Sequence, residues 1–435
     1  MIPKHDIPVA ILGAGLTGLS AALACQREGI GYRLYERDSE PGGLARTTEE
    51  AGYRFDHTGH LLHLGNAALR DEVLGWLGND FSVIQRKSKI WSHGVYTDYP
   101  FQANTFGLPA EVAYECVLGF VRAAAERHAA PPANFEEYCE RHFGAGISKH
   151  FMLPYNSRLW GVPAREITTA WCERFVPRPT LEDVIAGAVG KPRRALGYNQ
   201  EFVYPSRGIG QLTRAFAAQL TALETRVAPV RVALAEKQLI FEHASIGYDR
   251  LLSTIPLTKL LELCGPLPDE VARAKRALRC THLYYLDVAL NVPARQDWHW
   301  VYVPEARYPF YRVGCYSNFS EHMAPAGSAS LYVELADRAP PDLDALLPRV
   351  ISGLIELAAV KSPGEVAFAR LRRIDHAYVI FDQQHRRATE LVHEFLGEHG
   401  VTSVGRYGEW TYSSMEDALE SGRRVVREFA SSHGS

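Results

Sequence analysis

The chain has 435 residues, with 47 basic and 50 acidic side chains that leave a net charge of −3. This balance, without a polybasic run, argues against nucleic acid or an anionic membrane surface as a partner. No apolar stretch reaches the roughly 18 residues that a membrane-spanning helix needs. The length suffices for a large core divided into two or three domains.

Cysteine and histidine usage gives no sign of disulfides or metal. The seven cysteines contain no CxxC pair, and we expect small core residues in a reducing, cytoplasmic environment. The apolar start of the chain is too short for a signal peptide. His57, His60 and His63 lie in a strand-like loop, and we expect no metal site there.

At the start of the chain, a glycine turn joins an apolar strand to a helix. Gly13 permits the tight turn, Gly15 lets a pyrophosphate approach the backbone, and Gly18 lets the helix pack close to the sheet. The helix begins at Leu16 and Thr17, and its N-terminus offers unpaired N–H groups to phosphates. Together with the strand that follows, this pattern predicts a dinucleotide-binding site.

The second strand, Tyr32 to Tyr35, ends at an acidic residue. Glu36 is placed to bind the ribose hydroxyls, and an acid there disfavours the 2′-phosphate of NADP. A second glycine turn, Gly42-Gly43, follows directly and would meet the far side of a cofactor longer than NAD. We therefore predict FAD. The contacts predicted in this segment are Glu36, Arg37, Gly43, Leu44 and Arg46.

After Tyr99 the pattern becomes helical. Apolar residues at helical spacing predict a helix over Ala110 to His128, and a capping residue followed by Glu137 predicts another over Asn134 to Phe143. The basic stretch Lys191 to Arg194 is read as a solvated loop or, alternatively, as part of a mobile lid. The chain then returns through glycine turns into a helix predicted over Gln211 to Leu223.

The remaining elements alternate between strands and helices. Short strands are predicted at Val230 to Ala235, Gln238 to His243 and Arg250 to Thr254, and several antiparallel strands over residues 282 to 336. Helices over Asp342 to Leu357 and Asp382 to Gly397 bracket a predicted strand pair. A last strand, Val401 to Gly405, enters a glycine turn before a helix over Ser414 to Ala430.

These elements predict an α/β protein with a discontinuous Rossmann-type FAD-binding domain, an inserted helical segment and an antiparallel-sheet substrate domain. The expected segments are 1–98, 199–280 and 396–435 for the FAD-binding domain, 99–198 for the helical substrate or lid domain, and 281–395 for the antiparallel-sheet domain.

Arginines and tyrosines recur beside glycine and proline turns in the rest of the chain. Arginine pairs bidentately with phosphate oxygens, tyrosine hydroxyls add donors, and aromatic faces hold a base or sugar. Taken singly, a tyrosine at strand spacing is more often a half-buried sheet residue. Arg312 and Arg406, each next to an aromatic cluster, favour a nucleotide diphosphate ligand.

These residues resemble the motifs of the UDP-galactopyranose mutase family, eukaryotic-type branch, within the amine-oxidase-like and protoporphyrinogen-oxidase-like FAD flavoproteins. The resemblance extends along nearly the whole chain. The matching segments are Asp56-His57-Thr58-Gly59-His60, Tyr99 to Gln102, Pro154 to Trp160, Phe310-Tyr311-Arg312 with Ser317 to Ser320, and Gly405 to Tyr412.

The resemblance implies roles for particular residues. The catalytic residues would be His60 over the flavin and the diphosphate arginines Arg312 and Arg406. The implied substrate contacts are Tyr99, Gln102, Asn156, Trp160, Tyr302, Tyr378 and Tyr412, and the further cofactor contacts are Gly59, Gly405 and Asp417. The departures from the family pattern are Thr58 in place of a glycine, Ile209 in a turn that is normally glycine-rich, and the short segment Met415 to Ser421, which leaves the contacts of Asp417 open.

The implied reaction is the interconversion of pyranose and furanose forms of a nucleotide-diphosphate sugar, with a UDP-sugar as the family default. Reduced FAD would attack the anomeric carbon through N5 and form a flavin–sugar adduct. NADPH or NADH would be the reductant. The main alternative is an FAD oxidoreductase of the amine oxidase, protoporphyrinogen oxidase or desaturase type. A flavin-bearing binding protein is a distant third, and the sequence does not indicate the oligomeric state.

Overall fold

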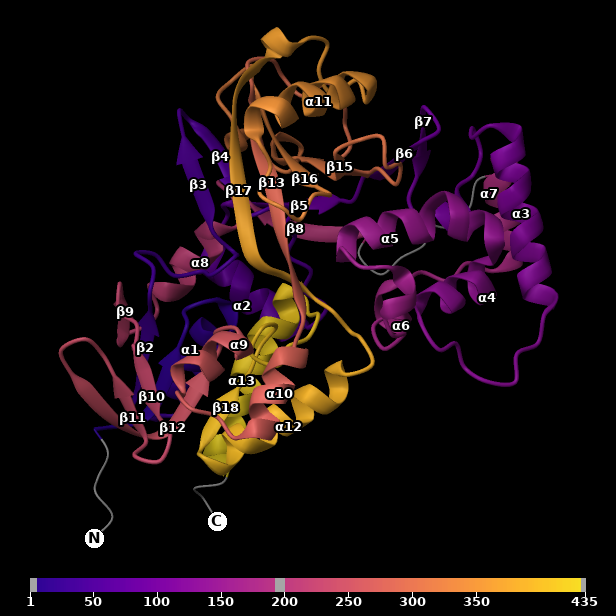
Figure 1. The fold of residues 1–435 in the computed structure, drawn as a ribbon. Helices are drawn as coiled ribbons and strands as arrows, with labels where there is room; N and C mark the ends of the chain where they lie inside the picture. The colour runs from indigo at the N-terminus through magenta and orange to yellow at the C-terminus, as the bar shows by residue number, and fades with distance from the viewer. Residues whose placement is uncertain (1–5, 192–199, 432–435) are drawn as a thin grey trace.

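The computed structural model describes residues 6–191 and 200–431. Residues 192–194 of the predicted basic loop lie outside these ranges. Within the described ranges, no helix is both long and apolar enough to cross a membrane. The chain forms two large sheets, two short two-stranded sheets, and a group of helices beside the second large sheet (Figure 1).

The first large sheet is the Rossmann sheet. Its strands are β10 (Arg231–Ala233), β11 (Gln238–Ile240), β12 (Ser245–Ser253), β1 (Ile7–Leu12), β2 (Tyr32–Glu36) and β9 (Leu223–Thr225) in that order, with β18 (Val401–Ser403) also paired to β12. The pairs β1–β2, β1–β12, β2–β9 and β12–β18 are parallel. This topology confirms the predicted α/β class.

Helices cover both faces of the Rossmann sheet, so its central strand is apolar on both sides. Val9 and Ile11 of β1 pack into one core, and Ala10 and Leu12 into the other. The first face carries α1 (Leu16–Arg27), α2 (Ala67–Leu77), α8 (Gly210–Ala217) and α13 (Met415–Ser431). The second face carries α9 (Leu257–Leu263), α10 (Asp269–Ala277) and α12 (His385–Glu398).

The second large sheet is mostly antiparallel. Its order is β17 (Val366–Val379), β13 (Cys280–Leu290), β16 (Ala329–Leu335), β15 (Phe310–Cys315), β14 (Trp300–Tyr302), β6 (Ser88–Ser92) and β7 (Val95–Asp98). One face packs on α11 (Leu343–Glu356) through an apolar core. Near this sheet lie the short helices η4 (Tyr316–Asn318), η5 (Glu321–Met323) and η6 (Pro363–Glu365).

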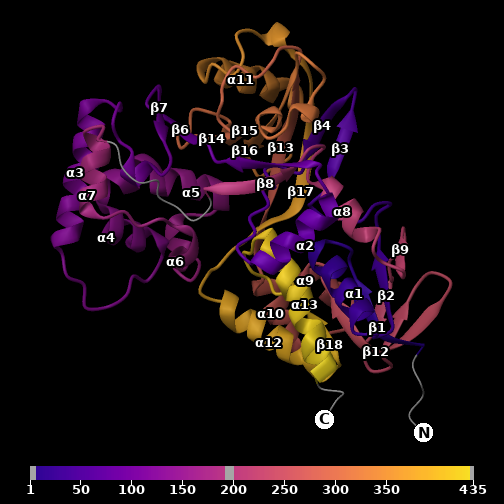
Figure 2. The same cartoon turned by 180° about the vertical axis from the view of Figure 1, so that it is seen from behind.

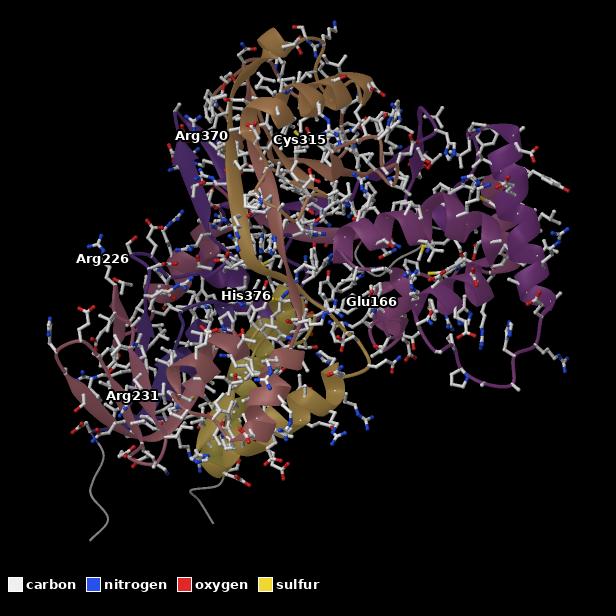
Figure 3. The ribbon with its side chains drawn as sticks, viewed as in Figure 1. Glu166, Arg226, Arg231, Cys315, Arg370 and His376 are labelled. Atoms are coloured by element: carbon white, nitrogen blue, oxygen red, sulfur yellow. The ribbon has the colours of Figure 1, made fainter. Side chains whose placement is uncertain are left out.

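Two short sheets and one ion pair connect the Rossmann part to the second sheet. Their strands are β3 (Thr47–Glu50) with β4 (Tyr53–Asp56), and β5 (Phe81–Gln85) with β8 (Glu201–Pro205). Arg370 on β17 donates to Glu50 on β3, with Nε 3.0 Å from Oε1 (Figure 3). The long strand β17 is thereby connected near its N-terminal end to the short sheet of β3 and β4.

The inserted helices stand to one side of the second sheet in both views (Figure 1, Figure 2). They are η1 (Phe101–Ala103), α3 (Ala110–Ala125), α4 (Phe135–Ile147), η2 (Ser148–Met152), α5 (Leu153–Trp160), η3 (Ala164–Glu166), α6 (Cys172–Phe175) and α7 (Leu181–Ala188). The predicted capping of α4 is confirmed, since the Asn134 side chain accepts a hydrogen bond from the Glu137 N–H at 3.0 Å.

Several predicted boundaries are wrong. The helix predicted to run to Leu223 ends at Ala217, because Leu223 begins β9 and pairs with β2. The strand pair predicted between the last helices is the single strand β17. The segment 1–98 includes β6 and β7, which pair into the second sheet. Helix α12 packs on the Rossmann sheet, although most of it was assigned to the antiparallel-sheet domain. We propose that the predicted division otherwise holds.

Candidate active site

The turn between β1 and α1 is built for close approach of a ligand. Gly13 has φ +92°, which favours glycine, and a Cβ on Gly18 would overlap the carbonyl oxygen of Gly13. A Cβ on Gly15 would meet nothing within 4 Å. Two glycines are thus required by the fold itself, whereas Gly15 leaves open space at the N-terminus of α1, where a pyrophosphate would accept backbone N–H groups.

The second glycine turn packs directly against the first. Gly42 forms an isolated bridge with Gly15, and its N–H donates to the Ala14 carbonyl at 2.7 Å. Arg46 closes this turn, with Nε donating to the Gly43 carbonyl at 2.8 Å and Nη2 paired with Asp38 at 2.9 Å. Leu44 instead packs against the core under the inserted helices. The structure therefore brings both predicted glycine turns to one place.

The two polar residues at the end of β2 point in different directions. Glu36 is buried, and its carboxylate accepts hydrogen bonds from the N–H groups of Ala14 (2.8 Å) and Asp38 (2.9 Å). This places the carboxylate at the glycine turn, where further lone pairs remain for ribose hydroxyls. The side chain of Arg37 is 77% exposed and contacts only Asp38 among the ion pairs found.

The C-terminal turn completes this region. Gly405 has φ +83°, and a Cβ there would overlap the side chain of Thr17 on α1. Asp417 does not point toward the glycine turns. It caps the start of α13 through Ser414 (Oγ–Oδ2 2.8 Å) and pairs with Arg174 on α6 at 2.8 Å. In this conformation Asp417 connects the inserted helices to α13.

The different environments of Gly15 and Gly18 predict opposite outcomes for alanine substitutions. Gly15→Ala should leave the unfolding temperature of the ligand-free protein unchanged but weaken dinucleotide binding by about tenfold or more, since the methyl group fills the open space. Gly18→Ala should destabilise the fold by about 1–3 kcal/mol through backbone overlap. Thermal unfolding and dinucleotide retained per chain after gel filtration separate the two. Equal retention in Gly15→Ala and the parent would contradict the assignment.

The turn that carries His60 lies between the Rossmann part and the second sheet. Nδ1 of His60 is buried without a hydrogen-bond partner among the described residues. Burial, with the nearby charges of His57 and Arg406, lowers the pKa of His60 to about 4. Nδ1 of His57 lies 2.8 Å from the hydroxyl of Tyr285. His60 is therefore neutral at pH 7.

Asp56, directly before this turn, is buried at the junction of several segments. Its carboxylate accepts hydrogen bonds from Thr47 Oγ1 (2.6 Å), Tyr204 OH (2.5 Å) and the N–H of Ile209 (3.2 Å). Ile209, which departs from the family's glycine-rich turn, is fully buried there. Burial raises the pKa of Asp56 to about 7, although these three donors oppose the shift.

The raised pKa of Asp56 predicts a pH-dependent stability. The unfolded group ionises near pH 3.8 and the folded group near 7, so the stabilisation is complete below the first value and is lost as pH rises through the second. The loss amounts to up to about 4 kcal/mol. Asp56→Asn should flatten this slope in urea unfolding across the interval, whereas the exposed Asp71→Asn should keep it. A parent slope retained by Asp56→Asn would show that another group causes it.

Arg312 lies in a row of polar side chains that crosses the second sheet. Neighbouring strands pair Tyr302 with Arg312, Arg312 with Glu334, Glu334 with Tyr285, and Tyr285 with Arg372. This row lies on the face opposite the α11 core, because a residue next to each member of the row packs toward α11. These neighbours are Val301, Val313, Val333, Leu286 and Leu371.

Glu334 is the partner that holds Arg312. Glu334 is fully buried, and its Oε1 lies 2.6 Å from Nη2 of Arg312. Burial opposes the charge of Arg312, but Glu334 and the nearby hydroxyl of Tyr378 raise its pKa above the usual value. The Nε of Arg312 and Oε2 of Glu334 are buried without partners in the described part of the chain. The pair thus keeps unused hydrogen-bonding capacity.

Sequence reasoning missed Glu334. The signal that points to it is an acid inside the apolar strand Leu331–Leu335, where Val333 and Leu335 flank it. A charged side chain in such a strand either points to the solvent-exposed face or is buried with a partner of opposite charge. The ion pair with Arg312 on the neighbouring strand shows that Glu334 is buried with a partner.

Arg406 reaches the same place from the Rossmann side. Its Nη1 and Nη2 donate to the carbonyls of Ser413 (3.1 Å) and Ala377 (3.0 Å), and its guanidinium lies 4.6 Å from the ring centroid of Tyr412. No carboxylate pairs with Arg406 among the ion pairs found in the described residues, and its Nε is buried without a partner there. Its positive charge is therefore uncompensated by an acid.

Aromatic rings join the two arginines. Arg312 Nη2 lies 3.2 Å from the hydroxyl of Tyr378, and the ring of Tyr378 lies 6.2 Å from that of Tyr412. Trp160 contacts Tyr378 at a centroid distance of 5.5 Å, and its Nε1 is another buried donor without a described partner. The structure thus brings Arg312, Arg406 and three of the predicted substrate contacts into one cluster.

The other predicted substrate contacts lie at or beyond the edge of this cluster. Tyr302 lies 5.3 Å from Tyr99 between ring centroids. Gln102 is buried, and its Nε2 donates to the Pro177 carbonyl at 2.8 Å. Asn156 on α5 donates through Nδ2 to the carbonyl of Met152, the last residue of η2, at 2.8 Å. Both amides retain a carbonyl oxygen for a ligand.

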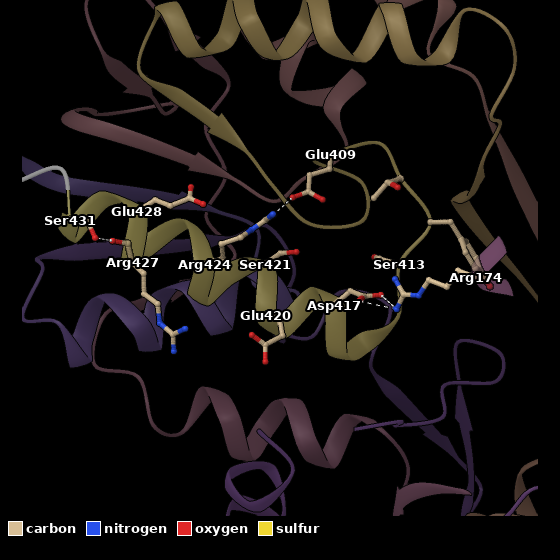
Figure 4. A pocket seen from close by; sticks show the side chains of 12 residues that line it. Arg174, Glu409, Ser413, Asp417, Glu420, Ser421, Arg424, Arg427, Glu428 and Ser431 are labelled. Carbon is tan, nitrogen blue, oxygen red and sulfur yellow. Dashed lines mark hydrogen bonds and ion pairs between the residues drawn. The ribbon is translucent and has the colours of Figure 1, made fainter. Parts of the chain in front are cut away.

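A groove of about 990 Å³ runs along α13, beside this cluster (Figure 4). Besides Tyr412, its lining consists of hydroxyl side chains and of charged residues of both signs, among them Asp417. Ion pairs join Arg174 to Asp417 at 2.8 Å and Arg424 to Glu409 at 2.8 Å across it. These pairs compensate one another, so the groove lacks the uncompensated positive charge that the buried arginines provide.

Comparison with known proteins gives matches to the first glycine turn and to the fold of the whole chain. A family of NAD(P)-binding Rossmann-like domains matches residues 11–73. A 1-hydroxycarotenoid 3,4-desaturase from Flavobacterium sp. (strain P99-3) is 30% identical over 106 residues, which are 23% of this chain and 21% of the desaturase. The chain therefore matches about a fifth of the length of that curated relative.

A crystal structure of reduced UDP-galactopyranose mutase superposes with a TM-score of 0.92 at 27% identity, covering 98% of this chain and 96% of that one. The predicted resemblance to UDP-galactopyranose mutase is confirmed over nearly the whole chain. Cyclohexylamine oxidase from Brevibacterium oxydans IH-35A superposes with a TM-score of 0.70 at 15% identity, covering 99% of this chain and 100% of that one. At this identity the likeness shows the fold alone. The fold that this chain shares with UDP-galactopyranose mutase therefore also occurs in an amine oxidase.

Proposed function

We propose that this protein is a flavin-dependent isomerase that interconverts pyranose and furanose forms of a nucleotide-diphosphate sugar. The observation that carries the proposal is the joining of Arg312 on β15 and Arg406 in the turn after β18 by two tyrosines, Tyr378 and Tyr412. Two arginines with buried, unpartnered Nε atoms form a site for a diphosphate. The UDP-galactopyranose mutase likeness over 98% of the chain supports a UDP-sugar as the substrate.

The cofactor that fits the glycine turns is FAD. The open space at Gly15, the buried Glu36 carboxylate and the adjoining turn at Gly42 suit a dinucleotide that continues past the first turn. His60 offers an unpartnered ring nitrogen farther along. When bound in its reduced form, FAD supplies the covalent chemistry at the sugar. We propose NADPH or NADH as the reductant in a cytoplasmic setting.

The residues of this chain bind and orient the substrate and stabilise the charge of its diphosphate. Arg312 and Arg406 hold the diphosphate and stabilise its charge as the bond to the sugar breaks. The hydroxyls of Tyr378 and Tyr412 are placed to donate to phosphate oxygens. Glu334 holds Arg312 in place without neutralising the second arginine. His60, neutral at pH 7 because of its lowered pKa, adds no positive charge beside the two arginines.

The alternative is an FAD oxidoreductase of the amine oxidase type, whose fold this chain shares. An oxidase of an amine or an apolar substrate needs no diphosphate site, whereas the two arginines leave donors free beside the predicted flavin region. The presence of both arginines in one cluster therefore favours the mutase.

The redox state of the flavin distinguishes the two functions. In the mutase, oxidised enzyme should be inactive on a panel of nucleotide-diphosphate sugars, and reduction by dithionite or NADPH should start pyranose–furanose interconversion. One reduction should support many turnovers, because the reaction consumes no electrons. Chromatography of the sugars and the flavin absorbance measure both. Anaerobic bleaching of the oxidised flavin by substrate alone, with peroxide formed on admitting oxygen, would establish the oxidase instead.

A further inference from the structure

A tyrosine of the second sheet fills a slot between two glycines beside the His60 turn. Tyr332 on β16 is buried. Gly314 is its partner on β15, and a Cβ there would overlap the tyrosine ring. On the other side, a Cβ on Gly59 would lie 2.5 Å from the Tyr332 hydroxyl oxygen. Both glycines are therefore required for the ring to lie where it does.

Two further tyrosines from the same side contact the turn. The hydroxyl of Tyr316 donates to the Asp56 carbonyl at 2.6 Å, and the hydroxyl of Tyr285 lies 2.8 Å from Nδ1 of His57. The rings of Tyr316 and Tyr332 are themselves 5.0 Å apart. Three tyrosines thus contact residues 56, 57 and 59 in succession.

The turn itself is strained. Thr58 has φ +67°, a left-handed conformation that a β-branched side chain rarely adopts. Its N–H donates to the Asp56 carbonyl at 2.9 Å. A strained residue persists only where its surroundings hold it. The tyrosine contacts to the residues before and after Thr58 in the chain supply that restraint.

We propose that Tyr332 is a positioning residue that fixes the turn at Gly59 and thereby sets the place of His60 at the flavin site. The proposal rests on the proposed function in so far as His60 faces a flavin. Tyr332 lies two residues before Glu334 on the same face of β16, so one strand positions both the His60 turn and the diphosphate arginine.

Gly59→Ala, Tyr332→Phe and the double variant test this assignment in the FAD-loaded protein. Gly59 has an ordinary φ, and among the described protein atoms the added methyl group would meet only the side chain of Tyr332. We expect Gly59→Ala to speed hydrogen exchange of the 57–60 amides and to lower kcat about tenfold or more with KM nearly unchanged. Tyr332→Phe removes the nearest atom, and in that background Gly59→Ala should cost much less. Gly75→Ala, at a glycine with nothing near its Cβ, is the matched control.

The exchange measurement needs no turnover. Faster exchange in Gly59→Ala, relieved by Tyr332→Phe, supports the positioning role even if the protein proves inactive on nucleotide sugars, in which case only the proposed function fails. Strictly additive effects of the two substitutions, or exchange in Gly59→Ala equal to that of Gly75→Ala, would overturn the inference whatever the activity.

Discussion

Arg312→Ala should both inactivate and destabilise the protein. Loss of one charged contact to the diphosphate should cost about 2–5 kcal/mol of transition-state stabilisation. The substitution also leaves the fully buried Glu334 without its cation, which should lower the free energy of unfolding by about 3–5 kcal/mol. Steady-state kinetics of the reduced enzyme and urea unfolding measure the two effects.

A second substitution separates the two losses. Arg312→Ala combined with Glu334→Gln removes the orphaned charge, so most of the lost unfolding free energy should return while the activity remains low. Arg312→Lys should recover activity only in part, because the bidentate geometry of the guanidinium is lost. Recovery of activity together with stability in the double variant would mean that Arg312 serves the fold and not the diphosphate.

Arg406→Ala should inactivate the protein with a smaller effect on folding. Arg406 donates to two backbone carbonyls and has no acid that would be left behind. We expect a loss of about 2–5 kcal/mol in transition-state stabilisation, against about 1–3 kcal/mol in unfolding free energy from the unsatisfied carbonyls.

Arg424→Ala is the matched control for Arg406. Arg424 lies nearby on α13, pairs with Glu409, and its side chain is 61% exposed. A pair whose arginine is exposed and whose acid is partly exposed contributes about 0–1 kcal/mol, so kinetics and stability should stay close to those of the parent. An equal loss of activity in Arg424→Ala and Arg406→Ala would place the diphosphate in the groove along α13 instead.

The sequence predicted those parts of the molecule that depend only on residues close together in the chain. The glycine turn at Gly13 to Gly18 needs only adjacent residues, and its strand and helix lie where the pattern placed them. Arg312 and Arg406 were identified by family motifs, each of which is a short run. The motif could not show that Glu334 holds one arginine and no acid holds the other, because those contacts depend on strand pairing.

The wrong boundaries have the same physical origin. Ser88 to Asp98 lies within the segment 1–98 predicted for the FAD-binding domain, and only the parallel pairing of β6 with β14 assigns it to the second sheet. Leu223 continues a helical pattern, but its pairing with β2 ends the helix. The role of Tyr332 was equally hidden, since it depends on the pairing with Gly314 on the neighbouring strand and on Gly59, which is far away in the chain.

The packing of α13 on α1 has a consequence for the order of folding. Ser20 Oγ on α1 donates to the Leu419 carbonyl on α13 at 2.6 Å, and Gly422 lies so close to Thr17 that a Cβ would overlap its carbonyl oxygen. During synthesis the first strand and helix leave the ribosome long before this partner exists. Helix α1 therefore stays without this packing partner until nearly the whole chain has been made. A chain interrupted before α13 leaves this face of α1 uncovered.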